Sequence, residues 1–268
     1  MKVLFVCTGN TCRSPMAEGY LKTLGFYCES RGLAADGSKI SKNSATVMSE
    51  IGIDIGSHIS KQLKKSDIDA FDTIICMSKS HVDYLQALGI ECEILGDGIS
   101  DPYGGDIDTY RNCRDEIIKA ICKRFGSVQF MNERHIDSVL KIENTCFSHP
   151  WTRAGITEAL ENRTKFFVFE KNGEVIGYVG VSVILDEGYI TNIATLPEYR
   201  NQGVATALLT KLDYLAKLEN LSFISLEVRI SNKKAISLYE KFGYKTEGVR
   251  KNFYDDPKED ALIMTKRF

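Results

Sequence analysis

Residues 7–14 read Cys-Thr-Gly-Asn-Thr-Cys-Arg-Ser and directly follow the apolar run Lys2–Val6. An apolar run, then a glycine-containing loop, then helical spacing over Ser14–Leu24 predicts a buried strand, a tight loop and a helix. Pro15 suits the first turn of that helix, because the N–H that proline lacks would have no partner there. We therefore expect the loop to join a buried strand to a helix N-terminus.

The same loop has the spacing Cys-x5-Arg, from Cys7 to Arg13. Successive backbone N–H groups at a helix N-terminus form an anion-binding nest. Such a nest would stabilise the Cys7 thiolate, which is the nucleophilic form, and Arg13 would fork onto two phosphoryl oxygens. Gly9 would allow close backbone approach or a positive φ. The predicted phosphate-binding residues are Thr8, Gly9, Asn10, Thr11, Cys12, Arg13 and Ser14.

Length and charge limit the class of protein. A chain of 268 residues predicts two domains. The net charge is −2, and neither half has the basic excess that electrostatic binding of nucleic acid requires. No stretch approaches the roughly 18 apolar residues of a membrane span. We predict a cytoplasmic protein without a direct nucleic-acid or membrane partner.

The eight cysteines do not suggest a disulfide framework or a metal site. No Cys-x-x-Cys pair occurs in the sequence, and the four histidines are scattered. A zinc site usually needs clustered ligands, so we predict no metal. Most of the cysteines are expected to be small buried apolar residues.

The first half alternates short apolar runs with amphipathic stretches, which predicts an α/β domain with a doubly wound parallel sheet. Strands are expected at Lys2–Val6, Phe71–Met77 and Glu93–Leu95, and helices at Ser14–Leu24, Ser44–Ile51, Lys79–Leu88 and Asp106–Arg124.

The order of elements changes after Gly126, which suits a helix C-cap. We therefore place the domains at residues 1–126 and 127–268. The second half predicts an α+β domain with a mixed sheet, and Lys171-Asn172-Gly173-Glu174 is a hairpin turn. Strands are expected at Val128–Met131, Lys165–Glu170, Gly177–Leu185, Gly188–Thr195 and Ser222–Ile230, followed by two more, and helices at Asn132–Thr145, Thr152–Asn162, Gly203–Glu219 and Lys233–Lys241.

The first half resembles the low-molecular-weight protein phosphatase family over about residues 1–125. The resemblance rests on residues 7–14, on Ser57-His58-Ile59-Ser60-Lys61-Gln62-Leu63 and on Asp101-Pro102-Tyr103-Gly104-Gly105. Arsenate reductases share the opening loop, but they need a resolving cysteine after the second buried strand. Here Cys76 lies inside that strand, which argues against arsenate reduction.

The resemblance implies a role for each residue of the site. Cys7 is the nucleophile that becomes phosphorylated, and Arg13 stabilises the transferring group. Asp101 is the general acid for the leaving group and then the base for water. Asn10 and Ser14 support the loop and the thiolate. Taken alone, Asp101-Pro102 would read as an ordinary turn.

Thr11 bears on the substrate. Family members that act on phosphotyrosine usually have a larger aliphatic residue here, whereas Thr11 with the Asp-Pro-aromatic-Gly-Gly segment resembles the bacterial protein-arginine phosphatases. A small polar residue leaves room for a guanidinium group and a water. Cys12, close to Cys7, has two open interpretations: a reversible protective disulfide under oxidation or a cysteine that packs the loop.

A second loop, Arg200-Asn201-Gln202-Gly203-Val204-Ala205, precedes an expected helix. Backbone N–H groups at that N-terminus suit a pyrophosphate, and small residues permit its approach. On its own, the pattern is also typical of a surface loop that caps a helix.

The surrounding sequence resembles the GNAT acetyltransferases over about residues 128–268, although the usual second glycine is Ala205 here. The matching stretches are residues 192–199, 226–229 and 231–244. Within that superfamily the chain resembles bacterial ribosomal-protein-alanine N-acetyltransferase at Cys146–Thr152, Leu226–Arg229 and Arg250–Tyr254.

This resemblance implies acetyl-CoA as co-substrate. Glu227 would accept the ammonium proton of the acceptor, and Tyr239 would donate to the CoA sulfur. Taken alone, a strand glutamate is usually solvated and a tyrosine such as Tyr239 usually packs in a core. CoA contacts are expected from Ile193, Ala194, Thr195, Arg200, Asn201, Gln202, Gly203, Val204, Ala205, Thr206 and Asn232.

The sequence therefore predicts a bifunctional enzyme. One half would hydrolyse a phosphorylated protein, with phosphoarginine favoured over phosphotyrosine, and the other would acetylate the N-terminal alanine of a ribosomal protein. In the alternative, only one domain is active and the other targets or regulates it, or the acetyltransferase acts on a different amine.

Overall fold

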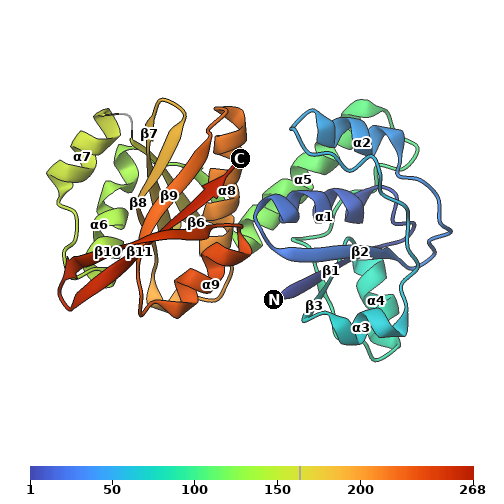
Figure 1. Cartoon of the computed structure of the whole chain (residues 1–268). Coiled ribbons are helices and arrows are strands. Elements are labelled where there is room, and N and C mark those ends of the chain that lie inside the picture. The colour runs from blue at the N-terminus through green and yellow to red at the C-terminus, as the bar shows by residue number, and fades with distance from the viewer. Residues whose placement is uncertain (163) are drawn as a thin grey trace. The chain divides into compact units, whose positions relative to one another are not determined.

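The computed structural model describes residues 1–162 and 164–268. The chain divides into two compact units, Met1–Gly126 and Ser127–Phe268, with Gly126 at the C-cap of a long helix (Figure 1). Within the described residues, no helix is both long and apolar enough to cross a membrane.

The first unit is built on a four-stranded, fully parallel sheet with the order β2-β1-β3-β4. Its elements are β1 (Lys2–Cys7), α1 (Arg13–Thr23), β2 (Tyr27–Gly32), α2 (Lys42–Ser49), α3 (Lys65–Ala70), β3 (Thr73–Cys76), α4 (Lys79–Ala87), β4 (Glu93–Ile94) and α5 (Ile107–Phe125).

Helices cover both faces of this sheet, which confirms the doubly wound architecture. Val3 and Phe5 of β1 pack with α1, α2 and α5 on one face, whereas Leu4 and Val6 pack with α3 and α4 on the other (Figure 1). The chain leaves β1 first toward β2 and later toward β3 on its other side. The carboxyl end of β1 therefore lies at a topological switch point, where open α/β sheets bind ligands.

Two elements of this unit were missing from the sequence prediction, β2 and α3. The strand β2 reads Tyr-Cys-Glu-Ser-Arg-Gly, and it is an edge strand with half-buried charges. Arg31 of β2 pairs with Asp67 of α3 at 3.0 Å. Because charge pairing and edge position replace the usual apolar run, hydrophobic periodicity could not find either element.

The second unit has a seven-stranded sheet with the order β10-β11-β9-β8-β7-β6-β5. The sheet is mixed, as the sequence predicted. Its elements are β5 (Ser127–Phe130), η1 (Glu133–His135), α6 (Ile136–Cys146), α7 (Arg153–Glu161), β6 (Thr164–Lys171), β7 (Glu174–Ile184), β8 (Glu187–Thr195), η2 (Pro197–Tyr199), α8 (Val204–Leu218), β9 (Phe223–Arg229), α9 (Lys233–Lys241), β10 (Lys245–Asp255) and β11 (Lys258–Arg267).

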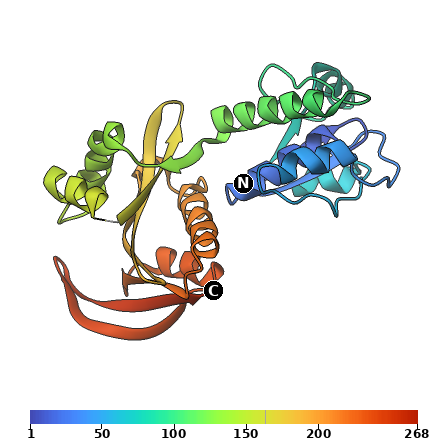
Figure 2. The same cartoon turned by 90° about the horizontal axis from the view of Figure 1, so that it is seen from above.

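Helices also cover both faces of the second sheet. Helices α6 and α7 lie on one face and α8 on the other (Figure 2). Leu226 and Val228 of β9 share a core with α8 and α9. Successive side chains of a strand point to opposite faces, so Glu227 points toward the α6 side.

The parallel strands β8 and β9 pair only at their starts. The register runs from Glu187↔Phe223 to Tyr189↔Ser225 and stops there among the described residues, although both strands continue. Two residues later, at Thr191, β8 has a bulge, because Gly180 faces Asn192 while Val181 faces Ile190. The two strands therefore separate, and the bulge bends β8 at that point.

Gly32 ends β2 against the phosphate-loop backbone, so a side chain there should destabilise the first unit. A Cβ on Gly32 would lie 2.6 Å from the Thr8 carbonyl oxygen and 2.9 Å from Ala35 Cβ. We expect Gly32→Ala to lower the free energy of unfolding by about 1–3 kcal/mol, measured by urea denaturation, and to reduce phosphatase activity. The control is Gly248→Ala, whose nearest contact would be an ordinary 3.7 Å to Ile263. Equal stability of the two variants would contradict the tight approach.

Candidate active sites

The Cys7 thiol lies at the carboxyl end of β1 with two hydrogen-bond partners. Its Sγ is 3.0 Å from Ser14 Oγ and accepts from the Asn10 N–H at 3.2 Å. Helix α1 begins at Arg13, and no side chain caps its first turn. One backbone N–H and one hydroxyl therefore contact the sulfur, close to the uncapped start of α1.

Asn10 organises the loop around that sulfur. It has a left-handed backbone, with φ 55°, and the expected positive φ of Gly9 is found here instead. Asparagine tolerates this conformation better than most residues. Its side-chain amide donates to Ser14 Oγ at 3.0 Å and to Ser30 Oγ at 2.8 Å, and its Oδ1 accepts from the Lys61 N–H at 2.8 Å. Asn10 therefore joins the hydroxyl that contacts Cys7 to the edge strand and to the Lys61 backbone.

Arg13 and Asp101 form an ion pair at the site. The Arg13 Nη2 donates to Asp101 Oδ2 at 2.6 Å, and Nη1 donates to the Ile99 carbonyl at 3.1 Å. The arginine side chain is 7% exposed and the aspartate side chain 52% exposed. The pair therefore brings the predicted acid to the predicted phosphate site.

Thr8 and His81 form a second contact that the sequence did not reveal. The Thr8 hydroxyl is 2.9 Å from His81 Nε2, and His81 Nδ1 is 2.9 Å from Ser78 Oγ. Burial, together with the charge of Arg13, lowers the pKa of His81 to about 4. The imidazole is therefore neutral at physiological pH and joins β3–α4 to the loop by hydrogen bonds rather than by charge.

Thr11 and Cys12 lie on the side of the loop that faces α5. The Thr11 hydroxyl is 3.7 Å from Cys12 Sγ, and Cys12 Sγ is 3.5 Å from the Tyr110 hydroxyl. The Tyr103 side chain is 82% exposed. All eight cysteines are free thiols. Both interpretations of Cys12 therefore stay open.

In the second unit, the predicted pyrophosphate loop leads into α8. Asn201 and Gly203 have left-handed backbones, with φ 62° and 87°. Gly203 is the N-cap, and no side chain caps the first turn of α8. The Arg200 Nε donates to the Thr195 carbonyl at 3.2 Å, which ties the loop to the end of β8. An uncapped helix start preceded by a folded-back loop is suited to an anion such as the CoA pyrophosphate.

The predicted pantetheine residues Ile193, Ala194 and Thr195 lie on β8 beyond its last pair with β9. Thr195 is 8% exposed, and its hydroxyl lacks a hydrogen-bond partner among the described residues. One edge of this segment therefore borders the separation between the strands, where an extended ligand with amide groups would fit.

The predicted base Glu227 lies on β9, whereas the predicted acid Tyr239 lies on α9, which packs against the face of β9 opposite to Glu227. Glu227 Oε1 accepts from Arg250 Nη1 at 3.1 Å, and the Tyr254 hydroxyl donates to the Glu227 carbonyl at 3.3 Å. Tyr239 of α9 packs in the apolar core, and burial raises its pKa. Its hydroxyl makes no hydrogen bond within residues 1–162 and 164–268. Asn232 caps α9 by accepting from the Ala235 N–H at 3.2 Å.

A buried carboxylate, Glu143, was missed by the sequence analysis. It is fully buried and accepts from the Trp151 N–H at 2.7 Å, from Asn192 Nδ2 at 2.8 Å and from the Tyr178 hydroxyl. Its partners come from three separate elements, and a glutamate inside an amphipathic helix gives no sequence signal of such a role.

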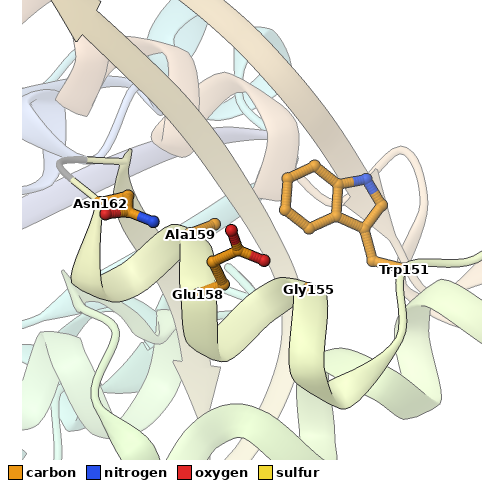
Figure 3. Close-up of a pocket in the computed structure, with 5 residues that line it drawn as sticks. All are labelled: Trp151, Gly155, Glu158, Ala159 and Asn162. Carbon is orange, nitrogen blue, oxygen red and sulfur yellow. The ribbon is translucent and has the colours of Figure 1, made fainter.

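Trp151 also borders a shallow groove of about 420 Å³ along α7. Its indole leans over the helix beside Gly155, and Glu158 and Asn162 project from the same side (Figure 3). Elsewhere in the described residues, no group of three or more His, Cys, Asp or Glu side chains could hold a metal ion.

The two halves of the chain match different families of known proteins. Residues 2–134 match the model for the low molecular weight phosphotyrosine protein phosphatase, and residues 136–244 match the acetyltransferase (GNAT) family. A protein-arginine-phosphatase from Geobacillus stearothermophilus is 40% identical over 131 residues, which are 43% of this chain and 88% of that protein. A Bacillus subtilis protein named for alanine N-acetylation of ribosomal protein bS18 is 43% identical over 144 residues, 53% of this chain and 95% of that protein.

The chain belongs to both families. The crystal structure of the ribosomal-protein-S18-alanine N-acetyltransferase from Escherichia coli resembles the second unit, with a TM-score of 0.51 and 30% identity over 53% of this chain and 93% of that one. The chain thus combines a phosphatase domain and a GNAT acetyltransferase domain, as the sequence predicted. Members of the GNAT family use acetyl-CoA as the acetyl donor.

The lowered pKa of His81 predicts a pH dependence of stability. The folded state holds the imidazole neutral down to about pH 4, whereas an ordinary histidine accepts a proton near 6.5. This contribution is therefore fully present above pH 6.5 and is lost as the pH falls from 6.5 to 4. We expect the urea midpoint of the first unit, followed by far-UV circular dichroism, to fall over that range. The fall should be smaller in His81→Asn, and identical slopes would contradict the assignment.

Proposed function

We propose that the first unit is a cysteine-dependent protein phosphatase that favours phosphoarginine and also accepts phosphotyrosine. The observation that carries this proposal is the grouping of Cys7, the α1 N-terminus, Arg13 and Asp101 at the carboxyl end of β1. The name of the Geobacillus relative supports the arginine preference.

In the proposed reaction, the Cys7 thiolate attacks phosphorus, so an S–P bond forms as the P–N or P–O bond to the substrate breaks. Asp101 gives a proton to the leaving nitrogen or oxygen. Asp101 then takes a proton from water, which attacks the phosphocysteine and releases inorganic phosphate. Arg13 leaves Asp101 to hold the phosphoryl oxygens during both steps.

We propose that the second unit transfers an acetyl group from acetyl-CoA to the N-terminal alanine of a ribosomal protein. The separation of β8 from β9 next to the uncapped start of α8 supports donor binding there, and the Bacillus subtilis relative supports the acceptor. Asn201, Gln202, Val204, Ala205 and Thr206 would surround the pyrophosphate.

Glu227 would accept the proton that the acceptor ammonium must lose before it attacks. Tyr239 would give a proton to the leaving thiolate, and its raised pKa means that it keeps that proton at neutral pH. The Asn232 side-chain oxygen already caps α9, so its side-chain nitrogen would be left to contact acetyl-CoA. A ribosomal acceptor implies that the enzyme acts in the cytoplasm.

A matched set of variants separates the two activities from the alternative of one active domain. Cys7→Ser should reduce phosphatase kcat at least about 10³-fold and leave acetylation unchanged. Glu227→Gln combined with Tyr239→Phe should reduce acetylation by about 10²-fold or more and leave phosphatase turnover unchanged. Both are measured on the full chain with phosphoarginine protein and an N-terminal alanine peptide. Phosphatase turnover that survives Cys7→Ser, or acetylation that survives the double variant, would refute the corresponding site.

Thr11 should determine the phosphatase preference. Thr11→Ile should move the ratio of kcat/KM from phosphoarginine toward phosphotyrosine peptides by about tenfold or more, because the larger apolar side chain removes the room for a guanidinium and its water. Thr11→Ser is the matched control and should keep the original ratio. An unchanged ratio in Thr11→Ile would remove the basis for the phosphoarginine preference.

A further inference from the structure

Glu143 is a fully buried carboxylate in the acetyltransferase unit without a cationic partner among the described residues. Burying an isolated carboxylate is costly unless hydrogen bonds compensate it. Removal of the Glu143 carboxylate would leave three buried donors without an acceptor, which is destabilising. The carboxylate therefore ties together the three segments that supply those donors.

One of the three donors to Glu143 lies beside the separation of β8 and β9, and the other two come from the neighbouring strand and from the loop between α6 and α7. Asn192 lies just past the β8 bulge, opposite Gly180, where β8 has already left β9. Tyr178 comes from the neighbouring strand β7, and burial beside Glu143 raises its pKa, so it acts as a donor. The third donor, the Trp151 N–H, belongs to the loop between α6 and α7.

The loop between α6 and α7 also contacts the half of the sheet that lies on the β9 side of the separation. Ser148 Oγ donates to the Asp256 carbonyl, in the turn between β10 and β11, at 3.2 Å. At its start, Cys146 Sγ donates to the Thr195 carbonyl, at 3.6 Å. The loop thus extends from the end of β8 to the hairpin that carries Arg250, the partner of Glu227.

We propose that Glu143 is a positioning residue for the acceptor: its carboxylate fixes the α6–α7 loop to the bent part of β8 and so shapes the acceptor side of the acetyltransferase site. This rests on the proposed acetyltransferase function. Glu143 does not touch the reacting atoms. Glu143 acts through the Trp151 N–H and Asn192. Its hydrogen bonds among the described residues do not include the predicted pyrophosphate loop, Arg200–Ala205.

The test uses Glu143→Gln in the full chain. Glutamate and glutamine have nearly equal size, but glutamine has an NH2 group in place of one carboxylate oxygen. That NH2 group would face a hydrogen-bond donor, so a hydrogen bond to the loop or to β8 is lost. We expect KM for an N-terminal alanine peptide to rise about tenfold while KM for acetyl-CoA changes less than about twofold. Tyr178→Phe, which keeps the carboxylate and the Trp151 contact, should show a smaller rise. Glu161→Gln, an exposed carboxylate near the end of α7, is the neutral control.

The chain has a single tryptophan, so its fluorescence reports on this loop alone. We expect acrylamide quenching of Trp151 to increase in Glu143→Gln, and the alanine peptide to change Trp151 emission in the unmodified protein. If the variant does not fold, the peptide titration of the unmodified protein decides, and unchanged emission at saturation would overturn the proposal.

The two proposals fail in different ways. If the unmodified protein acetylates no alanine peptide, the proposed function is wrong and the acceptor-positioning role of Glu143 is overturned with it. A rise of quenching in the variant would then show only that the carboxylate holds the α6–α7 loop. If the unmodified protein is active but the variant has an unchanged peptide KM or an equally raised acetyl-CoA KM, Glu143 has no acceptor-positioning role.

Discussion

The first turn of a helix leaves backbone N–H groups without partners inside the helix, and both candidate sites depend on this constraint. In the first unit β1 ends at Cys7 and α1 begins at Arg13; in the second, β8 ends at Thr195 and α8 begins at Val204. Neither helix has a side-chain cap on its first turn. By contrast, Asp106 and Asn232 cap α5 and α9. Since α2, α4 and α6 also begin without a side-chain cap, the missing cap permits an anion at α1 and α8 but does not single these two helices out.

In both units, the carboxylate that is predicted to act as acid or base forms an ion pair with an arginine. Asp101 pairs with Arg13, and Glu227 pairs with Arg250. The pair of Glu227 with Arg250 is largely exposed, so solvent screens its attraction. Arg13 is only 7% exposed, so its separation from Asp101 is costly unless another anion takes the place of the carboxylate. In both pairs the arginine orients the carboxylate.

The sequence predicted those features of the sites that contiguous residues form. The residues of the Cys7–Ser14 loop are contiguous, and the apolar strand before them has a clear pattern, so the loop and its helix could be located directly. Asp101 and Glu227 were identified through family resemblance, because a turn aspartate or a strand glutamate has no distinctive pattern of its own. The structure places Asp101 against Arg13, but the roles of both carboxylates remain predictions.

What the sequence could not show are contacts between distant segments. Ser30 reaches Asn10 from a polar edge strand, His81 reaches Thr8 from another part of the chain, and Glu143 collects donors from three elements. Each of these residues is a polar side chain whose environment depends on the tertiary fold. Hydrophobic periodicity carries no information about such partners.

The short pairing between β8 and β9 has a mechanical consequence. Strands β5–β8 and β9–β11 are two well-paired half-sheets, and the residue pairs from Glu187↔Phe223 to Tyr189↔Ser225 join them. The two half-sheets nevertheless share one apolar core, in which residues of β6, β7, β9 and β11 pack with α8. Beyond the junction, this side-chain packing holds the half-sheets together where the described strands no longer pair. A ligand that bonds to the β8 backbone there would add the hydrogen bonds that β9 does not make.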